Sequence, residues 1–150
     1  MIRVGFLTNN TRADNGWGRT SRELIESLRH RGMRVAVLVE DDGGMEGERR
    51  LLRRSQANPV FLFLSVVRAL PSLYVCDIVH AFDGYPYAII GALAAKLLGK
   101  KFVVTLHGTY ALDSFYNHRV YIRILYRWAL RQADALVGVS AYTLRAVGEF

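Results

Sequence analysis

Two histidines and an aspartate lie at or near the ends of two stretches with the composition of buried β-strands. Residues 100–109 read Lys-Lys-Phe-Val-Val-Thr-Leu-His-Gly-Thr, so an apolar run ends in His107 and a glycine. A second such run, residues 77–82, contains His80 and is followed by Asp83. Because open α/β sheets bind ligands at the carboxyl ends of parallel strands, we expect these three side chains to gather at one edge. There His107 could hydrogen-bond a sugar hydroxyl or a phosphate; a structural histidine bonded to a backbone carbonyl is the alternative.

A glycine-containing loop, Gly16-Trp17-Gly18, follows the first predicted strand and leads into a helix. The free N–H groups and the dipole of such a helix suit a phosphate or a carboxylate, and glycine lets the backbone approach the anion closely. A purely structural turn is the alternative. A dinucleotide fingerprint would need glycine where Ser21 stands, although Glu40 lies at a suitable distance, so NAD remains one of the anions considered.

Apolar runs of strand length alternate with helical patterns along the whole chain. Strands are expected at residues 3–8, 34–40, 77–82, 102–106 and 135–139, and helices at 20–32, 59–70, 87–98, 114–132 and 140–147. The first helix start rests on Thr20 and Glu23 in capping-box spacing, and Pro71 is expected to end the second. This alternation predicts an α/β fold with a doubly wound, mainly parallel sheet in one domain, 1–150.

Three segments allow two interpretations each. Residues 48–54 are basic enough for a solvated helical piece or a mobile lid. Residues 60–70 are apolar all round except for Arg68, which fits a helix packed on the sheet or one lying in a membrane interface. Four arginines recur every fourth residue in the 114–132 helix and form either a solvated face or, with its aromatic residues, a basic face for anionic lipid. They are Arg119, Arg123, Arg127 and Arg131.

The composition narrows the class of protein. A 150-residue chain that is 51% hydrophobic can form one real core, and a net charge of +7 favours phosphates, anionic lipid or nucleic acid. Cys76 is the single cysteine, which favours a reducing compartment, and the apolar runs are too short for a secretory signal or a membrane span. We therefore expect a soluble, cytoplasmic protein without a metal site. No recognition helix or RNA-binding motif supports nucleic acid as the partner.

Three groups of residues, in order and spacing, resemble the N-terminal domain of a GT-B glycosyltransferase, and in particular the retaining enzymes of glycosyltransferase family 4. The first is the opening strand with its glycine loop, running through residues 19–24 to 31–35. The second is Asp-Ile-Val-His-Ala at 77–81 with the following helix and Val-Thr-Leu-His-Gly at 104–108. The third is Ala-Asp-Ala-Leu-Val-Gly-Val-Ser at 133–140. Together they span nearly the whole chain.

The resemblance implies a Rossmann-like domain that mainly binds the acceptor, while a C-terminal domain, which does not follow Phe150, binds the nucleotide-sugar donor. It implies transfer of a sugar without a required metal or other cofactor, and little activity for this chain alone. His107 would contact the transferred sugar or stabilise developing charge, whereas Phe82 stands where relatives often carry a second histidine, which leaves His80 without a clear role. Gly16 and Gly18 would lie near the donor's diphosphate, and Asp83, Tyr85 and Thr109 would line the acceptor side. Trp17, Arg19 and Gly108 are further substrate-binding residues that the resemblance implies.

Basic charge favours a lipid-linked or phosphorylated acceptor and a peripheral position on the inner membrane face. Two other functions remain open from the sequence. One is a non-catalytic, membrane-associated partner subunit that uses residues 60–70 and the arginine face. The other is a small nucleotide-binding Rossmann module.

Overall fold

A computed structural model describes residues 1–52, 58–108, 111–112 and 118–148. Within these ranges six strands form one parallel sheet in the order β3-β2-β1-β4-β5-β6. The strands are β1 (Arg3–Thr8), β2 (Arg34–Val39), β3 (Glu48–Arg50), β4 (Ile78–Phe82), β5 (Lys101–Leu106) and β6 (Ala135–Gly138). The helices are α1 (Gly16–His30), α2 (Pro59–Tyr74), α3 (Tyr87–Leu98), α5 (Val120–Arg131) and α6 (Ala141–Gly148).

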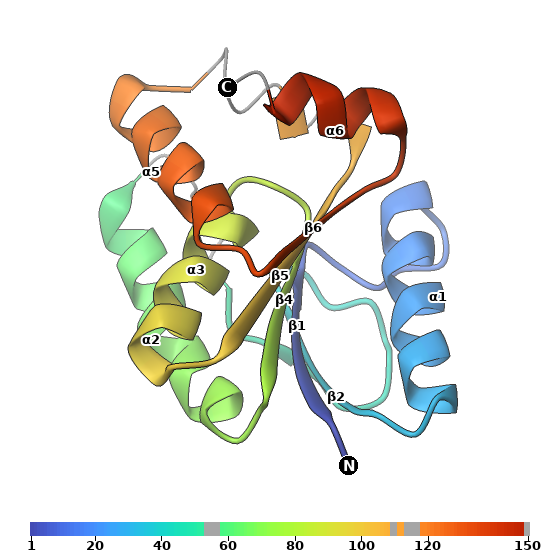
Figure 1. The fold of residues 1–150 in the computed structure, drawn as a ribbon. Helices are drawn as coiled ribbons and strands as arrows, with labels where there is room; N and C mark the ends of the chain where they lie inside the picture. The colour runs from blue at the N-terminus through green and yellow to red at the C-terminus, as the bar shows by residue number, and fades with distance from the viewer. Residues whose placement is uncertain (53–57, 109–110, 113–117, 149–150) are drawn as a thin grey trace.

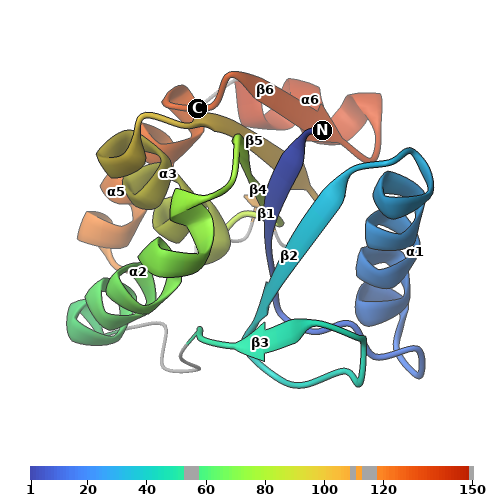
Figure 2. The same cartoon turned by 90° about the horizontal axis from the view of Figure 1, so that it is seen from below.

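Helices cover both faces of this sheet. Figures 1 and 2 show α2, α3 and α5 side by side on one face, with α1 on the opposite face and α6 next to β6. The predicted doubly wound, parallel α/β architecture is therefore confirmed. The crossover from β1 through α1 to β2 builds one side of the sheet, and the crossovers through α3 and α5 build the other.

Two apolar clusters fill the space between the sheet and its helices. The larger one lies under α2, α3 and α5, and the smaller one lies under α1. Leu7 and Phe6, neighbours on β1, are fully buried in the larger and the smaller cluster respectively, because successive strand residues point to opposite faces. Burial of each such side chain stabilises the fold by roughly 1.5–3 kcal/mol. A strand buried on both faces must be apolar throughout, which explains the continuous runs in the sequence.

The strand register determines which polar residues meet at the carboxyl edge. Thr8 pairs with Val39, and Phe82 pairs with Thr105, so the loops after β1, β2, β4 and β5 begin side by side. His80, in contrast, pairs with Phe6 and with Val103 inside the sheet. It lies two residues before the end of β4, behind the edge at which we expected it.

The first helix starts four residues earlier than predicted. The Asn15 side-chain oxygen accepts a hydrogen bond from the Gly18 amide at 2.7 Å, which makes Asn15 the N-cap. Thr20, the predicted cap, lies inside the helix and donates its hydroxyl proton to the Gly16 carbonyl at 2.8 Å. The helix therefore begins at the asparagine that ends the loop, and the capping-box pattern at Thr20 and Glu23 does not mark its start.

Two further segments differ from the prediction. The segment predicted as a helical piece or lid from residue 48 is an edge strand, β3, followed by the buried Leu52; residues 53 and 54 lie outside the described part. The Glu48 carboxylate accepts hydrogen bonds from the amides of residues 43 to 45 and from a threonine hydroxyl, which lower its pKa against the opposing effect of burial. Pro71 does not end α2, which continues to Tyr74. Pro71 is on the exposed side, where water can satisfy the carbonyl that loses its amide partner.

The long helix predicted at 114–132 is described only from Val120 onward as α5, since residues 113–117 lie outside the described part. Its face toward the core includes Ile122 and Tyr126, both fully buried. One sequence interpretation had placed the aromatic residues of this helix, which include Tyr126, on a basic face for lipid. Tyr126 belongs to the core instead.

Candidate functional site at the carboxyl edge of the sheet

Asp83 follows β4 in a conformation that only a surrounding structure can hold. Its side chain is 2% exposed, and its φ of 105° lies in the region that L-residues rarely adopt. Its amide donates to the Thr105 carbonyl at 2.8 Å, and Oδ1 accepts from the amides of Gly84 at 2.7 Å and His107 at 3.4 Å. Burial raises the pKa of this carboxyl to about 7, while these two amide bonds act in the opposite direction.

His107 follows β5 and lies between aromatic rings of two other elements. Its ring centroid is 4.3 Å from that of Phe82 and 5.8 Å from that of Trp17, so α1 and β5 meet here. The Nε2 atom is buried, and no described residue hydrogen-bonds it. Burial lowers the pKa of the imidazole, which favours the neutral ring. A neutral imidazole with an uncommitted nitrogen can donate to or accept from a bound ligand.

The two loop glycines at the start of α1 differ in their surroundings. A Cβ added to Gly16 would meet nothing within 4 Å, whereas one added to Gly18 would overlap Asn10 and the Arg12 backbone. Gly18 therefore serves close packing, and Gly16 leaves an open approach to the helix N-terminus. Arg19 is exposed, with Nε 3.9 Å from a Glu23 carboxylate oxygen, so it retains the freedom of a surface side chain.

A polar hollow of about 300 Å³ lies beside this helix start. Its lining residues come from the ends of β1 and β2 and from the loop before α1, and all carry amide, carboxylate or guanidinium groups. They are Asn9, Asn10, Arg12, Asp14, Asn15 and Asp41. Sequence reasoning missed this hollow, although the pair of asparagines directly after a buried strand was a signal that could have pointed to it.

Behind the hollow, a buried hydrogen-bond network joins three elements. The Tyr87 hydroxyl donates to a Glu40 carboxylate oxygen at 2.7 Å and accepts from the Asn9 amide at 3.2 Å. Burial, followed by the nearby Glu40 charge, raises the pKa of Tyr87 well above its ordinary value. Glu40, which the sequence offered as a possible ribose ligand, is 2% exposed and held by this tyrosine. Thr8 and Ser21 share a second buried hydrogen bond at 2.8 Å and tie β1 to α1.

The remaining predicted site residues belong to β4 or follow β4 and β5, and they differ in burial and in their contacts. Tyr85 is buried, its ring centroid is 4.4 Å from that of His118, and burial raises its pKa to about 12. Gly108 follows His107 with a φ of 44°, and Thr109 lies outside the described residues. His80 donates to or accepts from Thr105 Oγ1 at 2.8 Å, and burial lowers its pKa to about 4. His80 therefore has a structural partner inside the sheet.

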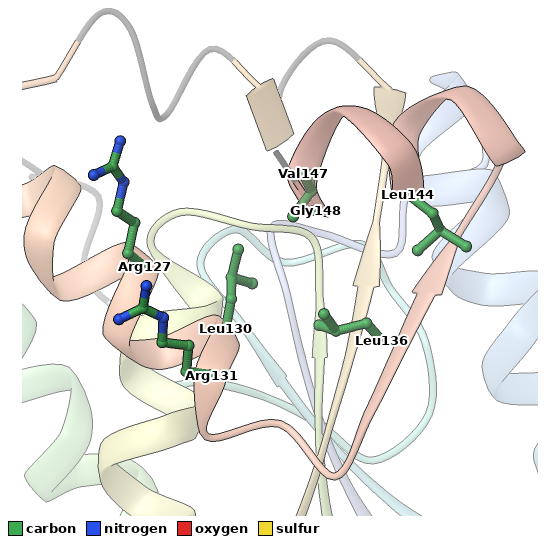
Figure 3. Close-up of a pocket in the computed structure, with 7 residues that line it drawn as sticks. All are labelled: Arg127, Leu130, Arg131, Leu136, Leu144, Val147 and Gly148. Carbon is green, nitrogen blue, oxygen red and sulfur yellow. The ribbon is translucent and has the colours of Figure 1, made fainter. Parts of the chain in front are cut away.

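A second hollow, of about 320 Å³, has the opposite chemistry. It lies between α5, β6 and α6, and Figure 3 shows Leu130 of α5, Leu136 of β6 and Leu144 of α6 around it, with the two arginines extending from α5 at one side. The residues that line it are Arg127, Leu130, Arg131, Leu136, Leu144, Val147 and Gly148. Two members of the predicted arginine stripe thus border an apolar hollow.

The sheet order and the crossovers on both faces define a doubly wound, Rossmann-like α/β domain. The model of glycosyltransferase family 4 matches residues 14–150, and the chain belongs to this family. A search of the curated proteins finds no match.

Solved structures show the same fold. A UDP-N-acetylglucosamine 2-epimerase superposes with a TM-score of 0.66 at 13% identity over 99% of this chain and 44% of its own. An α-glucosyltransferase in complex with UDP and DNA superposes with a TM-score of 0.52 at 17% identity over 91% of this chain and 37% of its own. The chain thus spans less than half the length of these structures and has the fold of a GT-B N-terminal domain, as the sequence resemblance predicted.

Among the described residues, no helix combines the length and apolarity that crossing a bilayer requires. Nor do the described side chains include a group of three or more His, Cys, Asp and Glu placed to hold a metal ion.

Proposed function

We propose that this glycosyltransferase-type domain provides the acceptor side of a transferase that moves a sugar from a nucleotide-sugar donor to an acceptor. The observation that carries the proposal is His107, which is held by Trp17 and Phe82 at the carboxyl edge with Nε2 uncommitted among the described residues. A neutral imidazole in this position can hydrogen-bond the sugar being transferred, and it can stabilise charge that develops as the glycosidic bond breaks.

Donor phosphates would approach the N-terminal end of α1. The amides of its first turn and the helix dipole attract an anion, and Gly16 leaves room for one. Trp17 in the same turn is in ring contact with His107, so an anion there would lie near the imidazole. This arrangement supports the assignment of Gly16, Trp17 and His107 to the donor and its sugar.

Asp83 and Tyr85 would form the acceptor side. Both are buried after the end of β4, Asp83 accepts a hydrogen bond from the His107 amide, and both carry groups that bind hydroxyls. The polar hollow beside Asn9 and Asp41 has the amide and carboxylate lining that suits a sugar, which supports a hydroxyl-rich acceptor or a sugar carried on a lipid. We propose a cytoplasmic site of action. Retention of configuration is inferred from the family resemblance.

We further propose that residues 1–150 act as one domain and transfer sugar only together with a donor-binding half. The solved structures with this fold support the idea, because this chain spans 44% and 37% of their lengths. The intact mass of the native product, measured after immunoprecipitation from its source cell, tests the arrangement. A mass near twice that of this chain indicates one polypeptide. A mass equal to it directs the search to a co-precipitated partner.

The function itself is tested with the complete native protein, or with the chain and its co-precipitated partner, and a panel of isotope-labelled nucleotide sugars. We expect the labelled sugar to appear in a new glycoside, with one free nucleotide released for each sugar transferred. Because an epimerase has the same fold, the sugar recovered is also analysed for inversion at C2. An epimerised nucleotide sugar without glycoside, or no donor turned over at all, would reject the transferase proposal.

A further inference from the structure

Helix α2 has two apolar faces, and the described residues cover only one of them. Toward the sheet it buries Leu62, Val66, Ala69 and Leu73. Its other face carries four apolar side chains at the spacing of one helical stripe. They are Val60, Phe63, Leu64 and Val67, which are 58%, 65%, 37% and 43% exposed. A single exposed apolar residue is ordinary, but a contiguous stripe of four marks an interaction surface.

Helix α2 itself carries no acidic side chain, and Arg68 is exposed beside the stripe. Arg49 of β3 donates from its guanidinium to Ser72 Oγ at 3.2 Å, and the Lys100 ammonium lies 5.8 Å from the centre of the Tyr74 ring. Three cations and an exposed tyrosine therefore accompany the second half of α2, while the stripe occupies its first half.

We propose that α2 lies in the interface of an anionic lipid bilayer. In this position Phe63 and Val67 would enter the boundary between headgroups and acyl chains, and Arg68 and Lys100 would face lipid phosphates. The net charge of +7 acts in the same direction. Helix α2 has 16 residues, which suits a helix that lies along the surface. The inference goes beyond sugar transfer and does not depend on it.

An anionic bilayer fits these observations better than a second protein. A protein partner would need its own acidic groups in register with these cations. A bilayer presents phosphates at every position along the helix, next to apolar depth for the stripe. Arg68 is exposed on α2 next to the stripe, and the Lys100 ammonium lies against the exposed Tyr74 ring at the end of the same helix, so apolar residues and cations can meet one interface at once. A second copy of the chain, or another protein, remains an outcome that the experiment distinguishes.

Co-sedimentation of the full chain with two kinds of vesicle tests the proposal. One kind contains phosphatidylcholine only, and the other also contains phosphatidylglycerol. We expect binding to the second kind, weakened by salt, and about tenfold or more weaker for the double variant Phe63→Ser/Val67→Ser. Arg68→Glu should weaken it further in low salt. All three side chains are exposed, so these variants should fold, as a thermal melt would verify.

The matched control is Val139→Ser, which changes an equally exposed apolar side chain at the end of the sheet, 55% exposed. It should bind vesicles like the natural protein. Three results would overturn the proposal. They are no binding to phosphatidylglycerol vesicles, an equal loss in Val139→Ser, or a dimer in light scattering that Phe63→Ser/Val67→Ser dissociates while vesicle binding is absent. The last result would assign the stripe to a second copy.

Discussion

Two groups of buried polar side chains lie along the same edge of the sheet, and they are bonded very differently. At the ends of β1 and β2, Tyr87, Glu40 and Asn9 form a continuous network within the fold. At the ends of β4 and β5, Asp83 holds a left-handed backbone conformation, and the Nε2 atom of His107 has no hydrogen-bond partner among the described residues. The first group satisfies itself, whereas the second leaves capacity for something else.

This difference separates structural polar groups from candidate ligand-binding groups better than burial does. Glu40 and Asp83 are both 2% exposed, so burial alone cannot distinguish them. A buried polar atom that lacks a partner costs free energy, and folds tolerate such a cost mainly where a ligand or a reaction uses the atom. Mutation should therefore affect turnover at the β4–β5 end and stability at the β1–β2 end.

The largest effect is expected for His107→Ala in the complete enzyme. If the imidazole stabilises charge in the transition state, its loss should lower turnover by about a hundredfold or more. Stability should change little by comparison. Initial rates at saturating donor and a urea unfolding curve measure the two quantities. His30→Ala, an exposed change on α1, is the control. Unchanged turnover would remove His107 from the mechanism and weaken the contrast between the two groups.

Asp83→Asn tests the electrostatic cost at the same end. Because burial raises the folded-state pKa from 3.8 to about 7, the native protein binds this proton more tightly than the unfolded chain. Stability from this group is therefore lost as the pH rises from about 4 through 7. The variant keeps the Oδ1 acceptor without the charge, so it should be more stable than the natural protein above pH 7 by on the order of a few kcal/mol. The advantage should vanish near pH 4.

Urea unfolding of both proteins across this pH range measures the difference. His80, with a pKa lowered to about 4 by burial, adds the opposite slope, since stability from it is lost as the pH falls through that range. It is present in both proteins and cancels in the comparison. Parallel pH profiles for the two proteins would show that Asp83 is not the titrating group.

Tyr87→Phe tests the polar group at the β1–β2 end, where we expect a loss of stability and not of turnover. It removes the hydroxyl that donates to Glu40, which leaves a buried carboxylate without this partner, at a cost of roughly 1–3 kcal/mol in unfolding free energy. Turnover per folded molecule should stay close to that of the natural enzyme. Tyr142→Phe, on an exposed tyrosine of α6, is the control. A stable variant with lost turnover would contradict the structural assignment of this network.

Much of the fold could be predicted because it follows from local patterns. The bounds of β1 and α3 match the expected residues, and Asn58 with Pro59 starts α2 as predicted. The edge strand β3 could not be predicted, because its sequence, Glu-Arg-Arg, has no apolar pattern and pairing with β2 alone creates it. Local patterns determine buried elements, but edge elements depend on their neighbours.

The site was predictable only in part for a related reason. His107 and Asp83 could be placed at strand ends, since a strand end is visible in the sequence. The contact between Trp17 and His107 and the bond between Tyr87 and Glu40 join residues far apart in the chain. Such pairs depend on sheet order and helix position, which no local pattern contains. His80 was expected near the same strand end, but the strand register places it inside the sheet, opposite Phe6.

The smallest effect concerns the two glycines at the α1 start, where the groups meet. Gly16→Ala adds a methyl group in open space within a helix, so stability should stay the same or rise by about 0.5–1 kcal/mol. If donor phosphates approach this backbone, the donor KM should rise by less than about tenfold, since a helix N-terminus contributes modestly. Gly18→Ala is the contrast, because its Cβ would overlap Asn10 and should destabilise the fold. An unchanged donor KM in Gly16→Ala would place the phosphates away from this helix start.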